Sequence, residues 1–125
     1  MSVKTFEIHA TVLRLAENKA SGPDGVPNEF AQLYWSEVKD KIVNLIQGFH
    51  SCCIDISNLN RANIVMVPKK DSPMEVKDFR PISIINIVPK IISKLLATRL
   101  AGFLPNLVSI RQIAFVQGRQ ISEIL

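Results

Sequence analysis

The stretch Asp78-Phe79-Arg80-Pro81-Ile82-Ser83, together with the earlier Val67-Pro68-Lys69-Lys70, decides the fold expected of this chain. Each half is an apolar, β-favouring run that carries a proline and a cation. Ile64 to Val67 predicts a short buried strand, and Phe79 to Ile85 is a second run of the same character. The polar loop from Lys69 to Asp78 joins them, so we expect a β-hairpin.

Three cations, Lys69, Lys70 and Arg80, fall near the mouth of this hairpin. A lysine offers a point charge and an arginine a planar fork, so such cations on a rigid hairpin are suited to hold a polyphosphate. The loop itself has three basic and three acidic side chains and is not a basic patch. Spacing alone therefore favours exposed, solvated cations over a phosphate site.

Strict alternation along the second strand places Arg80 on the same face as Ile82 and Ile84. That face is apolar, which does not suit a solvated arginine. Pro81 cannot donate a ladder hydrogen bond and favours an edge or a bulge. We therefore expect a β-bulge that turns Arg80 away from the apolar face.

Helices are expected before the hairpin, which makes the fold class α+β. The first runs from about Thr5 to Glu17, with Ser2 or Thr5 as its cap. A second begins with Pro27 in its first turn and continues through Trp35. A third is capped by Ser36 and runs to about Cys52. The inward positions are Phe6, Ala10, Leu13 and Ala16 in the first helix, and Val38, Ile42, Leu45, Ile46 and Phe49 in the third.

The clearest helix runs from Pro89 to about Leu104, ended by Pro105-Asn106. Its wide apolar arc comprises Ile91, Ile92, Leu95, Leu96, Leu100, Phe103 and Leu104. On a helical wheel Arg99 lies inside that arc, and an unpaired buried charge costs several kcal/mol. We therefore expect Arg99 to be substantially buried and bonded to a carboxylate or to backbone carbonyls of the N-terminal region, with Asp24 as the chosen partner. Gln112 to Arg119 is expected to be a short extended stretch and a glycine turn.

Composition bounds the remaining possibilities. The length fits one domain, and 47% of the residues are hydrophobic, enough for a core. Residues 61–125 hold ten basic and four acidic side chains, a net charge of +6, which suits a polyanionic partner but also an ordinary solvated surface. No segment reads as a signal peptide or a membrane span.

The cysteines and histidines have no metal-ligand spacing. Cys52 and Cys53 are adjacent and without a second pair, while His9 and His50 lie far apart in sequence. We interpret all four as core or surface residues. Two free thiols fit a reducing compartment, so the expected location is intracellular, in the cytoplasm or the nucleus.

Several short motifs of this sequence occur in the same order in a known protein family. They are Lys19-Ala20-Ser21-Gly22-Pro23-Asp24-Gly25, Leu59-Asn60, Ile64 to Lys69, Asp78 to Ser83, Lys90-Ile91-Ile92-Ser93-Lys94, Arg99-Leu100 and Gln112 to Arg119. Together they resemble the front part of the reverse transcriptase domain of non-LTR (LINE-type) retrotransposons, most like those of plants. The resemblance covers nearly the whole chain. It departs from the family at Pro89, where an aromatic residue is usual, and mildly at Gln117.

The resemblance implies that residues 1–125 are a partial reverse transcriptase domain, the fingers with the start of the palm. In the family a lysine and an arginine of the fingers hairpin hold the triphosphate of the incoming nucleotide, which matches Lys69 and Arg80, with Lys70 as the alternative lysine. Gln112, Gly118 and Arg119 match the segment near the template strand, while Phe115 is assigned to the core. The implied partners of the full domain are an RNA template, a DNA primer and a deoxynucleoside triphosphate.

The turn Gly22 to Gly25 faces nucleic acid in the family, although a plain turn between helices is the favoured interpretation here. The five aspartates of the chain are isolated from one another in sequence. Two-metal phosphoryl transfer needs carboxylates that hold both ions about 3.5–4 Å apart. The family carries its Mg²⁺-binding aspartates in later motifs, so we expect a truncated fragment that has no cofactor and is inactive alone.

Two other interpretations remain open. The chain could be a non-catalytic nucleic-acid-binding module, or an inert remnant, that uses or merely retains the basic C-terminal half. It could also be an unrelated helical interaction domain, which the absence of a hairpin would support. If a palm is missing, apolar surface around Phe115 and Ile121 to Leu125 is expected to be exposed.

Overall fold

The computed structural model describes residues 2–109, 111–114, 116, 118 and 119 of the 125-residue chain. Its helices are α1 (Thr5–Leu13), α2 (Asn28–Leu33), α3 (Trp35–His50), α4 (Ile87–Ala101) and α5 (Leu104–Leu107). Two strands, β1 (Ala62–Pro68) and β2 (Phe79–Ile85), flank a short 3-10 helix, η1 (Val76–Asp78). The predicted α+β class is confirmed.

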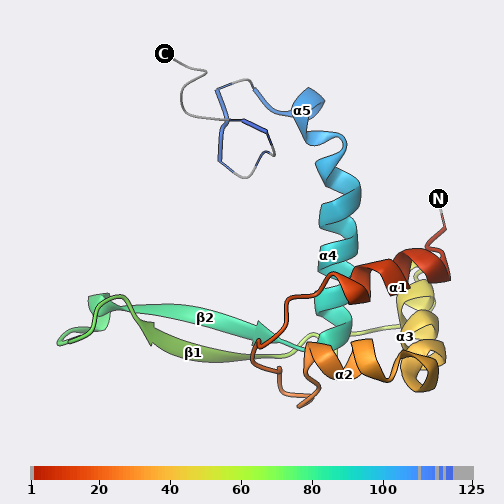
Figure 1. Ribbon diagram of the computed structural model, residues 1–125, viewed down its shortest axis with the longest axis horizontal. Coiled ribbons are helices and arrows are strands. Elements are labelled where there is room, and N and C mark those ends of the chain that lie inside the picture. Colours follow the sequence, from red (N-terminus) through yellow and green to blue (C-terminus); the bar gives the residue numbers. More distant parts are fainter. Residues whose placement is uncertain (1, 110, 115, 117, 120–125) are drawn as a thin grey trace.

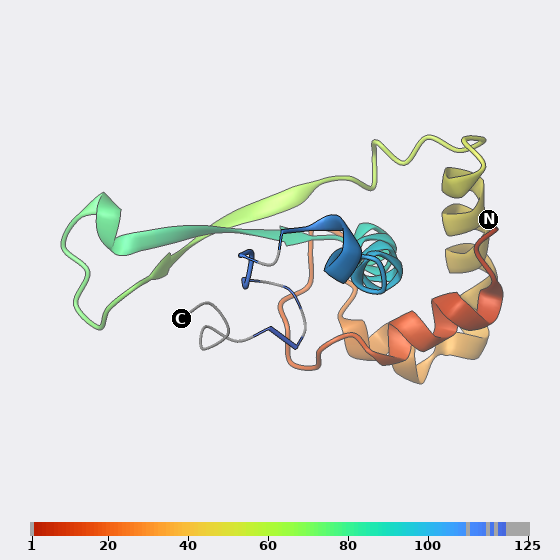
Figure 2. The ribbon, with the colours of Figure 1, turned by 90° about the horizontal axis from the view of Figure 1, so that it is seen from above.

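The helices and the hairpin occupy different parts of the molecule. Figure 1 shows α1, α2 and α3 gathered against the lower half of α4, while the β1–β2 hairpin extends away from them. Figure 2 shows α4 end-on between the helical group and the hairpin. In the described part of the chain, no helix is long and apolar enough to cross a membrane.

The core lies among the helices. Its buried apolar side chains are Val3, Ile8, Val12, Leu15, Ala31, Ile42, Val43, Ile46, Ile87, Val88, Ile91, Ile92 and Leu95. The spacing of those on α4, three or four residues apart, is the one that gives a helix a single buried stripe. Burying these side chains is the main favourable contribution to folding.

Helix α1 buries a different face from the predicted one. The buried residues of this segment are Ile8, Thr11, Val12 and Leu15, whereas Phe6 and Leu13 are 71% and 57% exposed. The segment is apolar on two sides, so periodicity alone did not select the side that meets α3 and α4. The helix is also shorter than expected and has no side-chain cap, because the residue before it is Lys4.

Helices α2 and α3 largely follow the prediction, with shifted starts. Pro27 precedes α2 rather than lying in its first turn, and α3 begins directly after Tyr34. The Ser36 hydroxyl donates to the Glu37 carboxylate and does not cap a helix. Ile42 and Ile46 are buried as predicted, and Val38 and Leu45 are partly buried, but Phe49 is 39% exposed.

The predicted hairpin is present, although neither strand is buried. The strands are antiparallel and pair one to one from Ala62 with Ile85 to Pro68 with Phe79. This continuous register contains no bulge, so the predicted bulge near Pro81 is wrong. Its premise fails because no residue of either strand is fully buried and the part of β2 around Arg80 stays exposed. Ile82, on the face of Arg80, is itself 46% exposed, and Arg80 reaches solvent without a bulge.

Helix α4 starts two residues before the predicted Pro89 and ends at Ala101. Pro89 therefore lies in the first turn, where a missing N–H costs nothing. Only the first half of the predicted apolar arc is buried, since Leu96, Leu100 and Phe103 are 52%, 49% and 64% exposed. Pro105 and Asn106 do not end this helix but lie within α5. Among the described residues from Gln112 to Arg119 there is no strand.

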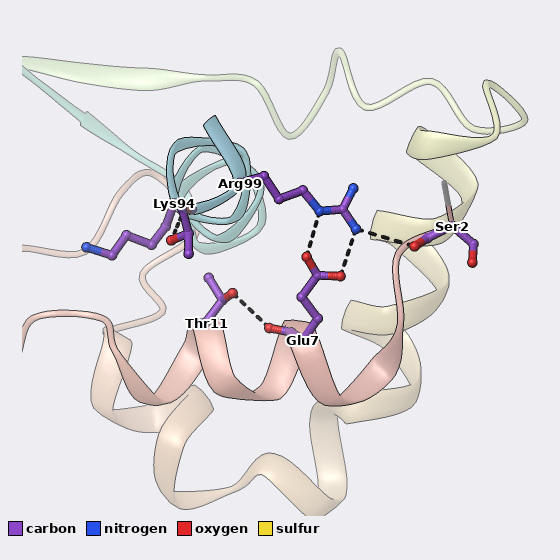
Figure 3. Close-up of polar contacts among 6 residues, drawn as sticks. Ser2, Glu7, Thr11, Lys94 and Arg99 are labelled. Carbon is purple, nitrogen blue, oxygen red and sulfur yellow. Dashed lines mark hydrogen bonds and ion pairs between the residues drawn. The ribbon is translucent and has the colours of Figure 1, made fainter. Parts of the chain in front are cut away.

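Arg99 connects α4 to the N-terminal region, as predicted. Its Nε and Nη2 donate to the Glu7 carboxylate over 2.6 and 2.7 Å, and Nη2 also donates to the Ser2 carbonyl (Figure 3). The Arg99 side chain is 25% exposed. The guanidinium lowers the pKa of Glu7 through these bonds. The expected partner Asp24 was wrong, because its carboxylate bonds elsewhere, to backbone N–H groups.

Candidate nucleic-acid interface

The loop between the strands is organised around the carboxylate of Asp78. Its Oδ2 accepts hydrogen bonds from the backbone N–H groups of Met74 and Glu75, at 2.9 and 3.0 Å. The Lys70 ammonium lies 2.9 Å from the same oxygen. These three donors, that of Met74 foremost, lower the pKa of Asp78 below its ordinary value. The carboxylate is thus ionised at neutral pH and holds the loop closed.

This arrangement separates the two candidate lysines. Lys70 is paired with Asp78, so its charge is compensated within the loop. The Lys69 ammonium donates to the Lys77 carbonyl over 2.7 Å, a neutral partner that leaves its charge uncompensated. Both lysines are exposed. Lys69 is therefore the better placed of the two for an anionic ligand.

Arg80 lies on the exposed part of β2, opposite Val67. Within the described residues its guanidinium takes part in no hydrogen bond or ion pair. The Lys69 N–H donates to the Asp78 carbonyl over 2.7 Å and so extends the ladder by one row. Because side chains alternate along a strand, this register puts Lys69, Val67 and Arg80 on one face of the hairpin.

The same face leads to two further lysines that sequence reasoning did not select. A concave surface is lined by Val65, Val67 and Ile82 of this face, together with Lys19 and Lys90 from outside the hairpin. Lys90 also donates to the Asn28 side chain over 3.1 Å. We call the set Lys19, Lys69, Arg80 and Lys90 the basic face. Lys19 and Lys90 are each the first residue of a motif shared with the family, and this could have drawn attention to them. No local sequence pattern indicates that the two lie close together.

The predicted template-binding residues of the C-terminal segment form a separate group. Arg119 donates to the carbonyls of Ser109 and Gln112 through Nη1 and to those of Pro105 and Val108 through Nη2. This guanidinium therefore organises its own segment. Gly118 is exposed with a φ of +85°, a conformation that glycine adopts readily. Gln112 is exposed, and its side chain donates to the Ala114 carbonyl.

Contact of Gln112, Gly118 and Arg119 with a template stays a prediction. No hydrogen bond or ion pair links them to the hairpin cations within the described part of the chain. Phe115, assigned to the core, and Ile121 to Leu125, expected to be exposed, lie outside the described residues, as does Gln117.

The remaining chemistry-bearing side chains do not converge on a site. Cys52 and Cys53 are free and exposed, and His9 stacks on Trp35 with ring centroids 4.7 Å apart. Over the residues whose placement is described, no group of three or more His, Cys, Asp or Glu side chains could hold a metal ion.

Comparisons with known proteins give two relatives. No protein-family model matches the chain. It is 28% identical over 116 residues to the uncharacterized 149 kDa protein of transposon TX1 from Xenopus laevis. It is 30% identical over 102 residues to the retrovirus-related Pol polyprotein from the type-2 retrotransposable element R2DM of Drosophila melanogaster. These alignments cover 92% and 74% of this chain but 9% of each relative, so the chain spans about a tenth of their length.

Proposed function

The chain is related to the proteins of non-LTR retrotransposons, and from this premise we propose that it is a fingers segment of an RNA-directed DNA polymerase. In this proposal the hairpin holds the triphosphate of an incoming deoxynucleotide. Lys69 contributes a point charge, and Arg80 contributes a planar fork that can bind two phosphate oxygens at once.

The observation that carries the proposal is the placement of these two cations. Lys69 and Arg80 share one face of an exposed hairpin, and neither is paired with a carboxylate among the described residues. An uncompensated cation attracts an anion more strongly than one that already has a partner. Lys70, the alternative lysine, would first have to leave Asp78.

The nucleic-acid partner is proposed to lie along the basic face. Lys19 and Lys90 lie at the concave end of the surface that Arg80 and Lys69 occupy further out. Phosphate contacts by lysine and arginine position a nucleic acid without reading its sequence. An RNA template paired with a DNA primer is the partner that fits a polymerase of this kind.

The Mg²⁺ chemistry of such a polymerase is not assigned to the residues of this chain. The residues that the structure describes supply no cluster of carboxylates that fits the ion. Binding and orientation of phosphate groups are therefore the functions proposed for the residues present.

Salt-dependent binding to an RNA–DNA duplex tests the proposal. The affinity is measured over a salt series for the parent, for the double variant Lys69→Gln/Arg80→Gln and for Lys39→Gln/Lys41→Gln on α3, which removes the same charge from another surface. The slope of log affinity against log salt is expected to fall by about 1 for each phosphate contact removed. It should fall in the hairpin variant and stay at the parental value in the α3 variant.

A non-catalytic nucleic-acid-binding module is the second candidate, favoured by the net charge of +6 in residues 61–125. It predicts duplex binding without any affinity for a free triphosphate. Equal loss of duplex affinity in the hairpin and α3 variants would contradict a role of the basic face. A parent that does not bind the duplex at low salt would indicate an inert remnant.

A further inference from the structure

The Gly22 to Gly25 turn has no role in the proposed function. It packs against the root of the hairpin, by which we mean the segment where β2 passes through Asn86 into α4. A Cβ atom on Gly22 would lie 2.5 Å from the carbonyl carbon of Ile85 and 2.6 Å from the backbone nitrogen of Asn86. Only a residue without a side chain can approach backbone this closely. The turn therefore meets β2 at the point where the strand passes into α4.

Asp24 in this turn satisfies backbone groups on both sides of the contact. Its Oδ2 accepts a hydrogen bond from the N–H of Ile87, the first residue of α4, over 2.8 Å. Its own N–H donates to the Asn86 side-chain oxygen over 2.9 Å. The residue before α4, Asn86, makes no cap of its own. A carboxylate from a distant segment thus takes the place of a local N-cap at this helix.

Asn86 extends the same contact to the other strand. It is 5% exposed, and its side-chain nitrogen donates to the Leu59 carbonyl over 2.8 Å. Leu59 lies just before β1, and Asn86 follows β2 directly. One side chain therefore connects both ends of the hairpin to the turn that Asp24 occupies.

The contacts at the root determine the orientation of the hairpin relative to α4. No residue of β1 or β2 is buried, so no described element packs firmly over the strands. Seven strand residues span about 23 Å, so a rotation of about 10° at the root would move the outer end by about 4 Å. A hydrogen bond to a phosphate oxygen tolerates about 0.5 Å. Small freedom at the root would thus remove Lys69 and Arg80 from a bound ligand.

We propose that Asp24 and Asn86 are positioning residues that fix the direction of the hairpin relative to α4. The consequence for ligand binding rests on the proposed function, whereas the fixed direction does not. The pair touches no ligand in this proposal and acts through the cations at the far end of the strands.

Distance measurements between spin labels test the proposal on the whole chain. Cys52 and Cys53, which are exposed, are replaced by serine, and labels are attached at Ser72→Cys in the hairpin loop and Lys39→Cys on α3. The distance distribution should be narrow in this parent and at least twofold broader in Asp24→Ala and in Asn86→Ala. Asp24→Asn, which keeps one acceptor oxygen, should broaden it less than Asp24→Ala.

The distance measurement needs a control variant and a milder variant in case the alanine variants do not fold. Thr98→Ala removes an exposed hydrogen bond to the Lys94 carbonyl within α4, away from Asp24 and Asn86, and should leave the distribution unchanged. If the alanine variants do not fold, Asp24→Asn supplies the same comparison. Variants that melt at lower temperature but keep the parental distribution below that temperature would show a purely stabilising role and overturn the proposal.

Titration with a deoxynucleoside triphosphate separates this proposal from the proposed function. A broadened hairpin in the Asp24 and Asn86 variants, combined with no binding by the parent, would support the positioning role and contradict the triphosphate site. Binding by the parent, combined with unchanged distance distributions in the variants, would support the triphosphate site and contradict the positioning role. If both proposals hold, the parent binds the triphosphate and Asp24→Ala binds it at least tenfold more weakly.

Discussion

Gly22→Ala is expected to destabilise the protein more than any other single methyl addition at a described glycine. The new Cβ would meet the backbone of Ile85 and Asn86 at 2.5–2.6 Å, and backbone cannot rotate away as a side chain can. Overpacking of this kind costs about 1–3 kcal/mol. The displaced turn also weakens the bonds from Asp24 to Ile87 and Asn86, each worth about 1 kcal/mol net. The expected loss is therefore about 2–4 kcal/mol of unfolding free energy.

Urea unfolding followed by circular dichroism measures this loss, with Gly102→Ala as the matched control. A Cβ on Gly102, at the end of α4, would have only the Arg99 carbonyl oxygen nearby, at an ordinary contact distance of 3.7 Å. Gly102 has a right-handed helical backbone conformation that alanine adopts readily. Gly102→Ala should therefore be close to neutral. Unfolding free energies of Gly22→Ala and the parent that agree within error would refute the close approach of the turn to the hairpin root.

Three further predictions concern the Arg99 contact, the hairpin loop and catalysis. Arg99→Met should lower the melting temperature less than Arg99→Ala, because methionine keeps the packing of the stem. Equal melting temperatures of Arg99→Ala and the parent would contradict the contact with Glu7. The lowered pKa of Asp78 stabilises the folded state above its ordinary value of 3.8, and this contribution is lost as the pH falls through the lower folded value. Asp78→Asn should flatten that acid dependence in urea unfolding measured from pH 6 downward. The isolated chain should extend no primer on an RNA template with Mg²⁺ or Mn²⁺, and template-dependent synthesis by pure protein would contradict this expectation.

The hairpin and the Arg99 contact could be predicted because local chemistry specifies them. Two β-favouring runs around a polar loop allow few arrangements, and Arg99 within an apolar arc needs a partner whatever the fold. The choice of that partner could not be predicted in the same way. Glu7 and Asp24 are both acidic residues of the N-terminal region, and only the folded chain places Glu7 beside α4.

Burial was less predictable than secondary structure. An apolar run such as Ile64 to Val67 indicates a strand but not whether anything covers it, and here nothing described does. Helix α1 has apolar side chains on two sides, and the predicted inward side with Phe6 is the exposed one, because Ile8 on the other side packs in the core. The predicted bulge at Pro81 followed from the same assumption of a covered face.

The contacts at the root of the hairpin could not be predicted from the sequence. Asp24 and Asn86 are 62 residues apart, and neither residue type is unusual in a turn. The family resemblance, in contrast, could be predicted from the sequence, because it rests on several motifs in the same order. The relationship to non-LTR retrotransposon proteins is confirmed, while the plant-like assignment has no support from relatives in a frog and a fly.

Titration of the chain with a deoxynucleoside triphosphate, followed by the backbone amide signals in NMR, tests the central claim most directly. The proposed site predicts shifts concentrated at Lys69 and around Arg80, absent with the unphosphorylated nucleoside. They should be lost in Lys69→Gln/Arg80→Gln and retained in Lys39→Gln/Lys41→Gln. Shifts of equal size at Lys39 and Lys41, or shifts that persist in the hairpin variant, would contradict it.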